Sequence, residues 1–152
     1  MPHHVFIVED HPLMRNMVAA YIDDLPDLSV CDSVRSAEEA LDRLPAAAEF
    51  VLVDISLPGM SGIELIREIR SRWPHLKCLV CSGHDEASYV DRSLEAGAHG
   101  YVAKGSPSEL ADALQCLRQG ETYLSASLRE HVEVIDPPAD SCGPIASVQN
   151  GE

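Results

Sequence analysis

The chain contains no long apolar run. Among its 152 residues, no uninterrupted hydrophobic segment approaches the roughly 20 residues that a membrane helix requires. The N-terminus, MPHHVFIVEDH, enters a strand-like run at once and lacks the basic and apolar regions of a signal peptide. These absences predict a cytoplasmic protein that is not inserted in a membrane.

Positive charge is also scarce. Lys and Arg number 11 against 25 Asp and Glu, which gives a formal net charge of −14. Nucleic-acid binding depends on a basic face that neutralises phosphates, so we expect no direct nucleic-acid binding by this chain. The hydrophobic content of 45% is nevertheless sufficient for the core of one domain.

A redox or metal-binding cysteine pair is another feature that the sequence does not support. Cys78 and Cys81 have the C-x-x-C spacing, but they lie in an apolar run, 76–82, that is typical of a strand. Residues three apart in a strand point to opposite faces, whereas low-pKa thiols of redox pairs lie at helix N-termini. We therefore interpret both cysteines as structural.

What the sequence does contain is a regular alternation of short apolar runs and amphipathic stretches. Strands are expected at 5–8, 28–34, 50–54, 76–82 and 99–104, and helices at 13–25, 37–46, 62–73, 86–96 and 107–119. Capping boxes of the form S-x-x-E, beginning at Ser36, Ser61 and Ser106, mark three of the helix starts. Five such alternations predict an α/β fold with a parallel sheet and helices on both faces.

The segment after residue 120 has a different character. Within 121–135, Leu124, Leu128, Val132 and Ile135 recur at helical spacing and predict a short helical extension, which Ser125 or Ser127 could cap. This extension is either an output or oligomerisation element or a helix that packs back onto the domain. Residues 136–152 are rich in Pro, Gly, Ser and Asp and predict a flexible tail or linker.

Polar side chains stand where the expected strands end. Glu9 and Asp10 follow the first strand and Asp54 the third, while Ser82 ends the fourth and Lys104 the fifth. Ligands of open parallel sheets bind outside these carboxyl ends. Carboxylates gathered there repel one another, and Mg²⁺, which prefers oxygen ligands, would relieve the repulsion.

The same group of residues suits a phosphoryl group. Lys104 adds a fixed positive charge and Ser82 a hydroxyl donor, so metal, lysine and hydroxyl would surround one carboxylate. A carboxylate can itself accept a phosphoryl group as an aspartyl phosphate. Asp54 is therefore the predicted acceptor.

These residues and their surroundings resemble the receiver domain of two-component response regulators. The matching segments are FIVEDH, LVDISLPGMSG, LVCSG and GYVAKG, and they span residues 5–120. CSGHDEASYVDRSLEAGAHGYVAKGSPSEL and GETYLSASLRE are similar to the NarL/FixJ-type subfamily. The resemblance implies a receiver domain at residues 1–120 with a flavodoxin-like, doubly wound (βα)5 fold and a five-stranded parallel sheet of order 2-1-3-4-5.

The resemblance also implies a metal site and a phosphoryl donor. Glu9, Asp10 and Asp54 would hold Mg²⁺ together with the backbone carbonyl of Ser56. A partner histidine kinase or phosphotransfer protein would phosphorylate Asp54, and Lys104 would pair with the phosphoryl group.

A switch is implied as well. Ser82 and Tyr101 would change position on phosphorylation and so alter contacts with a downstream protein target or within a homodimer.

Two departures from the family pattern are visible. Gly105 follows Lys104 where many receivers have proline, and the NarL-type helix-turn-helix is not found in residues 1–152. The alternative interpretation is the N-terminal regulatory domain of a NarL/FixJ-type DNA-binding transcription factor.

An enzyme is a third interpretation. An aspartyl-phosphate phosphotransferase or phosphatase acting on an outside substrate needs a substrate pocket, which the short loops after each strand do not provide. We therefore expect no enzyme activity beyond self-catalysed phosphotransfer to Asp54 and hydrolysis from it.

Overall fold

The computed structural model describes residues 3–44, 48–83, 87–103 and 108–125. The elements in chain order are β1 (His3–Val8), α1 (Pro12–Asp23), β2 (Leu28–Val34), α2 (Ala37–Arg43), β3 (Phe50–Val53), α3 (Gly62–Arg72), β4 (Lys77–Ser82), α4 (Ala87–Ala96), β5 (Gly100–Ala103), α5 (Ser108–Arg118) and β6 (Tyr123–Leu124). Each of the ten expected helices and strands is present, and their ends differ from expectation by three residues or fewer.

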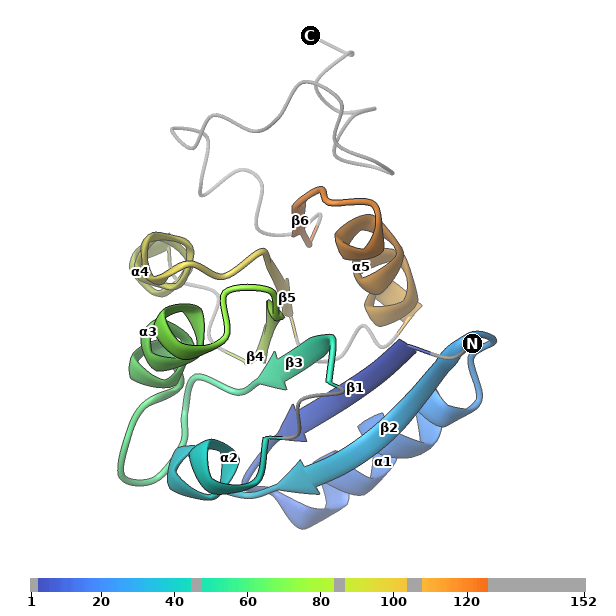
Figure 1. Cartoon of the computed structure of the whole chain (residues 1–152), viewed down its shortest axis with the longest axis horizontal. Helices are drawn as coiled ribbons and strands as arrows, with labels where there is room; N and C mark the ends of the chain where they lie inside the picture. Colours follow the sequence, from blue (N-terminus) through green and yellow to red (C-terminus); the bar gives the residue numbers. More distant parts are fainter. Residues whose placement is uncertain (1–2, 45–47, 84–86, 104–107, 126–152) are drawn as a thin grey trace, which may run out of the picture.

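All strands belong to one parallel sheet of order β2-β1-β3-β4-β5-β6. Helices α1 and α5 cover one face, and α2, α3 and α4 cover the other (Figure 1). The predicted doubly wound α/β fold and the order of the first five strands are thus confirmed. No helix in the described part of the chain is long and apolar enough to cross a membrane.

The number of strands is a correction, because the sheet has six strands rather than five. Tyr123 and Leu124 form the sixth and pair with Gly100 and Tyr101 of β5. Leu124 was expected in the helical extension of residues 121–135, and Ser125 as a possible cap of that helix. The residues of this extension after Ser125, and the expected tail at 136–152, lie outside the described residues.

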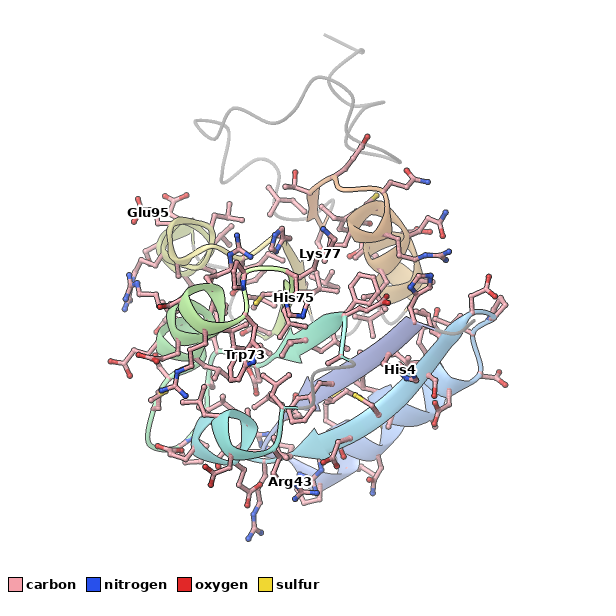
Figure 2. All side chains as sticks on the ribbon, in the orientation of Figure 1. His4, Arg43, Trp73, His75, Lys77 and Glu95 are labelled. Carbon is pink, nitrogen blue, oxygen red and sulfur yellow. The ribbon has the colours of Figure 1, made fainter. Side chains whose placement is uncertain are left out.

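Two hydrophobic cores fill the space between the sheet and its helices, and their side chains are drawn in Figure 2. Along β1, Val5 and Ile7 face one core while Phe6 and Val8 face the other, as the period of a strand requires. Cys78 belongs to the core that contains Phe6 and Val8, and Cys81 packs against the core that contains Val5 and Ile7. The two cysteines therefore point to opposite faces of the sheet, as predicted.

Local sequence signals explain where several helices begin and end. The Ser61 capping box is complete, since Ser61 Oγ accepts the Glu64 N–H and the Glu64 carboxylate accepts the Ser61 N–H. Helix α2 stops three residues early because Leu44 precedes Pro45 and is extended, with φ −62° and ψ 116°. The Ser106 capping box lies outside the described residues.

Candidate functional site

The sheet register brings three carboxylates together at its carboxyl end. Val8 and Val53 are opposite each other at the ends of β1 and β3. The Asp54 N–H donates to the Val8 carbonyl at 3.1 Å, which extends the pairing of the two strands by one residue. Glu9 and Asp10 therefore leave the sheet beside Asp54, as the strand-end pattern predicted.

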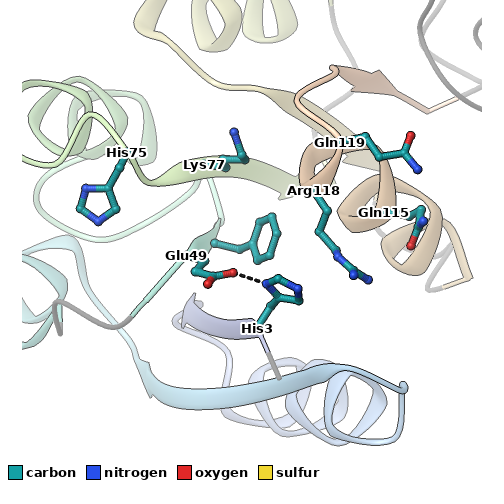
Figure 3. A pocket seen from close by; sticks show the side chains of 8 residues that line it. His3, Glu49, His75, Lys77, Gln115, Arg118 and Gln119 are labelled. Atoms are coloured by element: carbon teal, nitrogen blue, oxygen red, sulfur yellow. Dashed lines mark hydrogen bonds and ion pairs between the residues drawn. The ribbon is translucent and has the colours of Figure 1, made fainter. Parts of the chain in front are cut away.

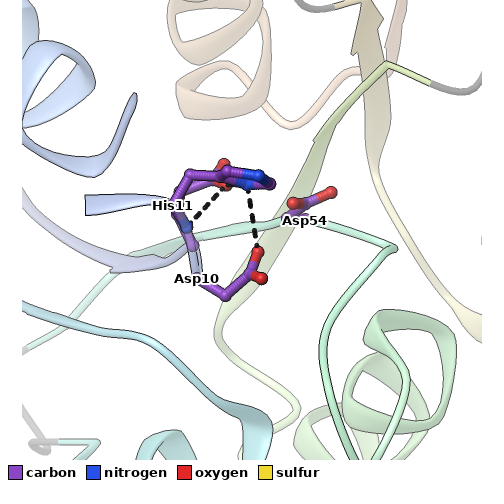
Figure 4. A group of neighbouring side chains, drawn as sticks. Asp10, His11 and Asp54 are labelled. Carbon is purple, nitrogen blue, oxygen red and sulfur yellow. Dashed lines mark hydrogen bonds and ion pairs between the residues drawn. The ribbon is translucent and has the colours of Figure 1, made fainter. Parts of the chain in front are cut away.

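Ligand atoms of Glu9, Asp10, His11 and Asp54 all lie within 4.8 Å of one another. Figure 4 shows the Asp10 and His11 side chains next to the carboxylate of Asp54. Glu9 and Asp54 are only 5% and 2% exposed. His11 Nδ1 lies 3.4 Å from both Glu9 Oε2 and Asp10 Oδ1. Sequence reasoning did not include His11 in this cluster, although its place directly after Asp10 was a signal.

Hydrogen bonding within the cluster is incomplete. Asp54 Oδ1 accepts the Ser56 N–H at 3.1 Å, and Glu9 Oε2 accepts the His11 N–H at 3.4 Å. Asp10 Oδ1 is buried and has no hydrogen-bond partner among the described residues. A buried acceptor without a donor costs free energy, which a bound cation would recover. The three carboxylates of this cluster, one of them with an oxygen that makes no hydrogen bond among the described residues, therefore fit Mg²⁺.

The loop after Asp54 is held by its backbone. The Ile55 carbonyl accepts the Leu57 N–H at 2.9 Å and the Gly62 N–H at 3.1 Å. A Cβ at Gly62 would lie 2.3 Å from the Asp54 carbonyl oxygen, so only glycine allows α3 to begin this close to the acceptor. The carboxylate of Asp54 thus stands on a rigid turn, which explains how an acidic residue is fixed at the end of an apolar strand.

Two of the other predicted site residues, Ser82 and Tyr101, lie in the described part of the sheet. Ser82 ends β4, is fully buried and lies opposite Ala103 of β5. Tyr101 is also fully buried, in the core next to α4. Lys104 lies outside the described residues, and a metal-binding role of the Ser56 carbonyl is implied only by the family resemblance. Their roles in the site stay predictions.

A cleft lies at the opposite end of the sheet, where the strands begin. This cleft of about 380 Å³ is lined by His3, Glu49, Phe50, His75, Lys77, Gln115, Arg118 and Gln119 (Figure 3). The His3 imidazole contacts the Glu49 carboxylate, while Lys77 and Arg118 project from β4 and α5. None of these residues was a sequence-predicted site residue, because no local motif links positions so far apart in the chain.

Comparison with known families agrees with this arrangement of fold and acidic cluster. The family model of the response regulator receiver domain matches residues 5–115. The chain belongs to this family. Receiver domains generally bind Mg²⁺ at an acidic pocket, and this receiver domain contains an acidic cluster of Glu9, Asp10 and Asp54.

Curated relatives of this receiver domain are regulators of the NarL/LuxR type. The DNA-binding transcriptional activator DevR/DosR of Mycobacterium tuberculosis is 36% identical over 143 residues, covering 88% of this chain and 66% of the relative. The response regulator UvrY of Escherichia coli O6:H1 is 28% identical over 151 residues, covering 97% of this chain and 69% of the relative. The chain thus spans about two thirds of the length of these proteins.

Solved structures give the same result for the fold. A two-component response regulator of the LuxR family from Aurantimonas sp. SI85-9A1 matches with a TM-score of 0.82 and 29% identity, covering 88% of this chain and 97% of that one. The isolated receiver domain of RcsB from Salmonella enterica serovar Typhimurium matches with a TM-score of 0.80 and 24% identity, covering 86% of this chain and 99% of that one. At that identity the second match shows the fold alone.

Proposed function

We propose that this receiver domain is a phosphoryl-operated switch in which Asp54 accepts a phosphoryl group from a histidine kinase or phosphotransfer protein. The observation that carries the proposal is the placement of the buried Asp54 carboxylate beside Glu9 and Asp10. Asp10 Oδ1 is buried and has no hydrogen-bond partner among the described residues. Three carboxylates in this position repel one another unless a cation is bound.

Glu9, Asp10 and Asp54 are the residues that would hold Mg²⁺, with the backbone carbonyl of Ser56 as a further ligand. The ion supplies positive charge that stabilises the oxygens of a transferring phosphoryl group. The Ser56 N–H, 3.1 Å from Asp54 Oδ1, fixes the direction of the acceptor carboxylate.

The transfer itself needs few groups from this chain. An Asp54 carboxylate oxygen attacks phosphorus, its new O–P bond forms as the N–P bond of a phosphohistidine breaks, and the donor imidazole leaves with the bonding electrons. Lys104 is proposed to neutralise charge on the phosphoryl oxygens and Ser82 to donate a hydrogen bond to one of them. Water later cleaves the acyl phosphate and releases inorganic phosphate.

An enzyme acting on an outside substrate has less support. The cavity lined by Glu9 and Asp54 with apolar residues of β1 and β3 has a volume of about 10 Å³. Ligand sites for small molecules are typically hundreds of Å³, on the order of 300 or more. We therefore propose no catalysis beyond phosphotransfer to Asp54 and hydrolysis from it.

The proposed output is a change in protein contacts through Ser82 and Tyr101, made to a downstream protein or to a second copy of this chain. A second candidate is the regulatory part of a longer DNA-binding regulator. It is favoured by the relative that is described as a DNA-binding transcriptional activator, of which this chain spans 66%. Because bacterial DNA lies in the cytoplasm, both candidates are proposed to act there.

Intact mass measurement tests the acceptor. With Mg²⁺ and acetyl phosphate, the wild-type chain is expected to gain the mass of one phosphoryl group, and Asp54→Asn is expected to gain none. Asp42→Asn is the matched control, because Asp42 is an exposed carboxylate on α2 away from the acidic cluster. Phosphorylation of Asp54→Asn at the wild-type rate would overturn the proposal.

A further inference from the structure

Strand β6 follows α5 in the chain and pairs with β5. The Tyr123 N–H donates to the His99 carbonyl at 3.2 Å, and the Ser125 N–H donates to the Tyr101 carbonyl at 3.0 Å. Tyr123 and Ser125 are each only 1% exposed. This segment is therefore part of the folded domain and does not lie loosely on its surface.

The close approach depends on Gly100. A Cβ at Gly100 would lie 2.9 Å from the Tyr123 carbonyl oxygen and 2.8 Å from Leu79 Cδ1. Any larger residue would push β6 away from β5. The first residue of β5 is thus suited to a neighbouring strand that the sequence pattern did not predict.

The side chain of Ser125 continues this attachment where the strand pairing stops. Its hydroxyl oxygen accepts the Ala103 N–H at 2.9 Å, and its O–H donates to the Glu109 carboxylate. Ser125 therefore links the last residue of β5 to the first turn of α5. Ser125 itself is buried and both bonds are partly buried, which limits their replacement by water.

Ala103 is adjacent to two residues with proposed roles in phosphoryl transfer, one in the sheet and one in the chain. It is opposite Ser82, the proposed hydroxyl donor, in the β4–β5 register. It also directly precedes Lys104 in the chain. A bond that fixes Ala103 consequently fixes the strand end from which Lys104 follows.

We propose that Ser125 is a positioning residue for phosphoryl acceptance, acting through Ala103 to hold the carboxyl end of β5 beside Ser82. The inference rests on the proposed function of Asp54 and adds a means of regulation. Coupling between two sites is reciprocal in free energy. If the Ser125 bond favours the phosphorylated state, phosphorylation must tighten the attachment of residues 123–125 by the same amount.

The experiment compares two buried serines in the full chain. Ser125→Ala removes the acceptor of the Ala103 N–H, whereas Ser93→Ala removes an equally buried hydroxyl that donates to the Tyr89 carbonyl within α4. The rate of phosphorylation by acetyl phosphate is expected to fall about ten-fold in Ser125→Ala, because small misplacements of catalytic groups slow reactions strongly. Ser93→Ala is expected to keep the wild-type rate.

A readout at the metal site separates positioning from general damage. The affinity for Mg²⁺, measured by calorimetry, is expected to be unchanged in Ser125→Ala, because Glu9, Asp10 and Asp54 directly follow β1 and β3, which β6 does not contact in the sheet. If Ser125→Ala does not fold, Glu109→Ala replaces it. That variant leaves the Ser125 oxygen in place but removes the group that orients it, and its rate is expected to fall between the other two. Glu109→Gln keeps an acceptor for Ser125 and is expected to restore the rate.

Hydrogen exchange of the Ser125 amide provides the reciprocal measurement, with beryllofluoride as the phosphoryl mimic. Exchange is expected to slow in the wild type when Mg²⁺ and beryllofluoride are added. A wild-type chain that is never phosphorylated would overturn the proposed function itself. If the wild type is phosphorylated, three results would overturn only the role of Ser125. They are a phosphorylation rate in Ser125→Ala equal to that of the wild type, a rate in Ser93→Ala reduced as much as in Ser125→Ala, and exchange of the Ser125 amide that beryllofluoride does not change.

Discussion

The two ends of the sheet differ in how they hold charge. At the carboxyl end, Glu9 and Asp54 are buried and fixed by backbone hydrogen bonds, and they stand close to Asp10. At the amino end, Lys77 and Arg118 line an open cleft, and neither has an ion-pair partner among the described residues. Within the part of the chain that the structure describes, these two cations thus make no ion pair, while carboxylates gather at the opposite end, in a chain whose net charge is −14.

The comparison teaches that burial, more than the sign of the charge, separates a binding site from a charged surface. Removing a carboxylate from water costs several kcal/mol unless something compensates it. At the carboxyl end, the exposed His11 imidazole lies 3.4 Å from carboxylate oxygens of Glu9 and Asp10. The exposed Arg118 and the half-buried Lys77 at the amino end line an open cleft that water can enter.

The largest expected effect is at Gly62, which supports the acceptor loop at the carboxyl end. Gly62→Ala places a Cβ 2.3 Å from the Asp54 carbonyl oxygen, so the backbone must move and the free energy of unfolding should fall by about 3 kcal/mol. Gly83→Ala is the control, because a Cβ at Gly83 would meet nothing within 4 Å. Denaturant unfolding of both variants checks the prediction, and equal stabilities would show that the loop is not held as described.

Metal binding should distinguish the two ends directly. Asp10→Ala removes a ligand and its unsatisfied oxygen, so the affinity for Mg²⁺ in calorimetry should fall about 100-fold. Without metal, the same variant should be slightly more stable than wild type, because one of three repelling charges is gone. Glu49→Gln, at the amino end, should leave Mg²⁺ affinity unchanged. A loss of affinity in Glu49→Gln comparable to that in Asp10→Ala would remove the contrast.

The positive charge at the amino end should affect the pKa of His99 and, through it, the pH dependence of stability. Burial, followed by the charges of Arg70 and Lys77, lowers the pKa of this imidazole to about 4. The unfolded chain, with an ordinary histidine pKa near 6.5, therefore binds the extra proton between about pH 6.5 and 4. Stability attributable to His99 is fully present above this window, falls as the pH drops through it, and changes no further below about pH 4.

His99→Asn tests this pH dependence, because asparagine can still accept the Cys78 N–H that His99 Nδ1 accepts at 3.1 Å. Between pH 6.5 and 4 the unfolding free energy of the variant should fall by less than that of the wild type, and the difference should be about 1–2 kcal/mol. This difference is smaller than the full effect of the pKa shift, because His99 is partly exposed and solvent screens its charge. Parallel loss of stability in both proteins would show that the carboxylates alone set the acid sensitivity.

Lys77→Gln should produce the smallest change. Lys77 is the third cause of the lowered His99 pKa, after burial and Arg70, so its removal should raise that pKa by only about half a unit. Lys77→Arg keeps the charge and should leave the pKa near its wild-type value. An NMR titration of the His99 ring measures both, and a fall in the pKa on loss of Lys77 would contradict the electrostatic assignment.

Much of the fold and the acidic site followed from local patterns. Asp54 was identifiable because a carboxylate after an apolar strand is conspicuous, and parallel strands carry their ends to one edge. Strand β6 was not identifiable, because Leu124 continues a helical spacing in the sequence and becomes a strand residue only through its pairing with Tyr101. The roles of Lys104 and the Ser56 carbonyl remain predictions, since the first lies outside the described residues and the second requires a bound ion.

Contacts between distant segments also escaped the sequence analysis. The Glu109 carboxylate accepts a hydrogen bond from the Ser125 hydroxyl, a contact that the S-x-x-E pattern of Ser106 and Glu109 did not indicate. The His99 ring accepts the Cys78 N–H and is partly buried, a contact that no local sequence pattern indicated. In both cases the partner lies at least 16 residues away, where periodicity and capping rules carry no information.

The sixth strand also affects how this domain can be cut. In its absence β5 would be the outermost strand, and the N–H and C=O groups of Gly100 to Ala103 that now meet Tyr123 to Ser125 would face solvent. An uncovered strand edge is a template on which another chain can add a strand, and natural sheets cover or interrupt such edges. A fragment ending at Gly120 would therefore gain a route to edge-to-edge aggregation that a fragment ending after Ser125 would not have.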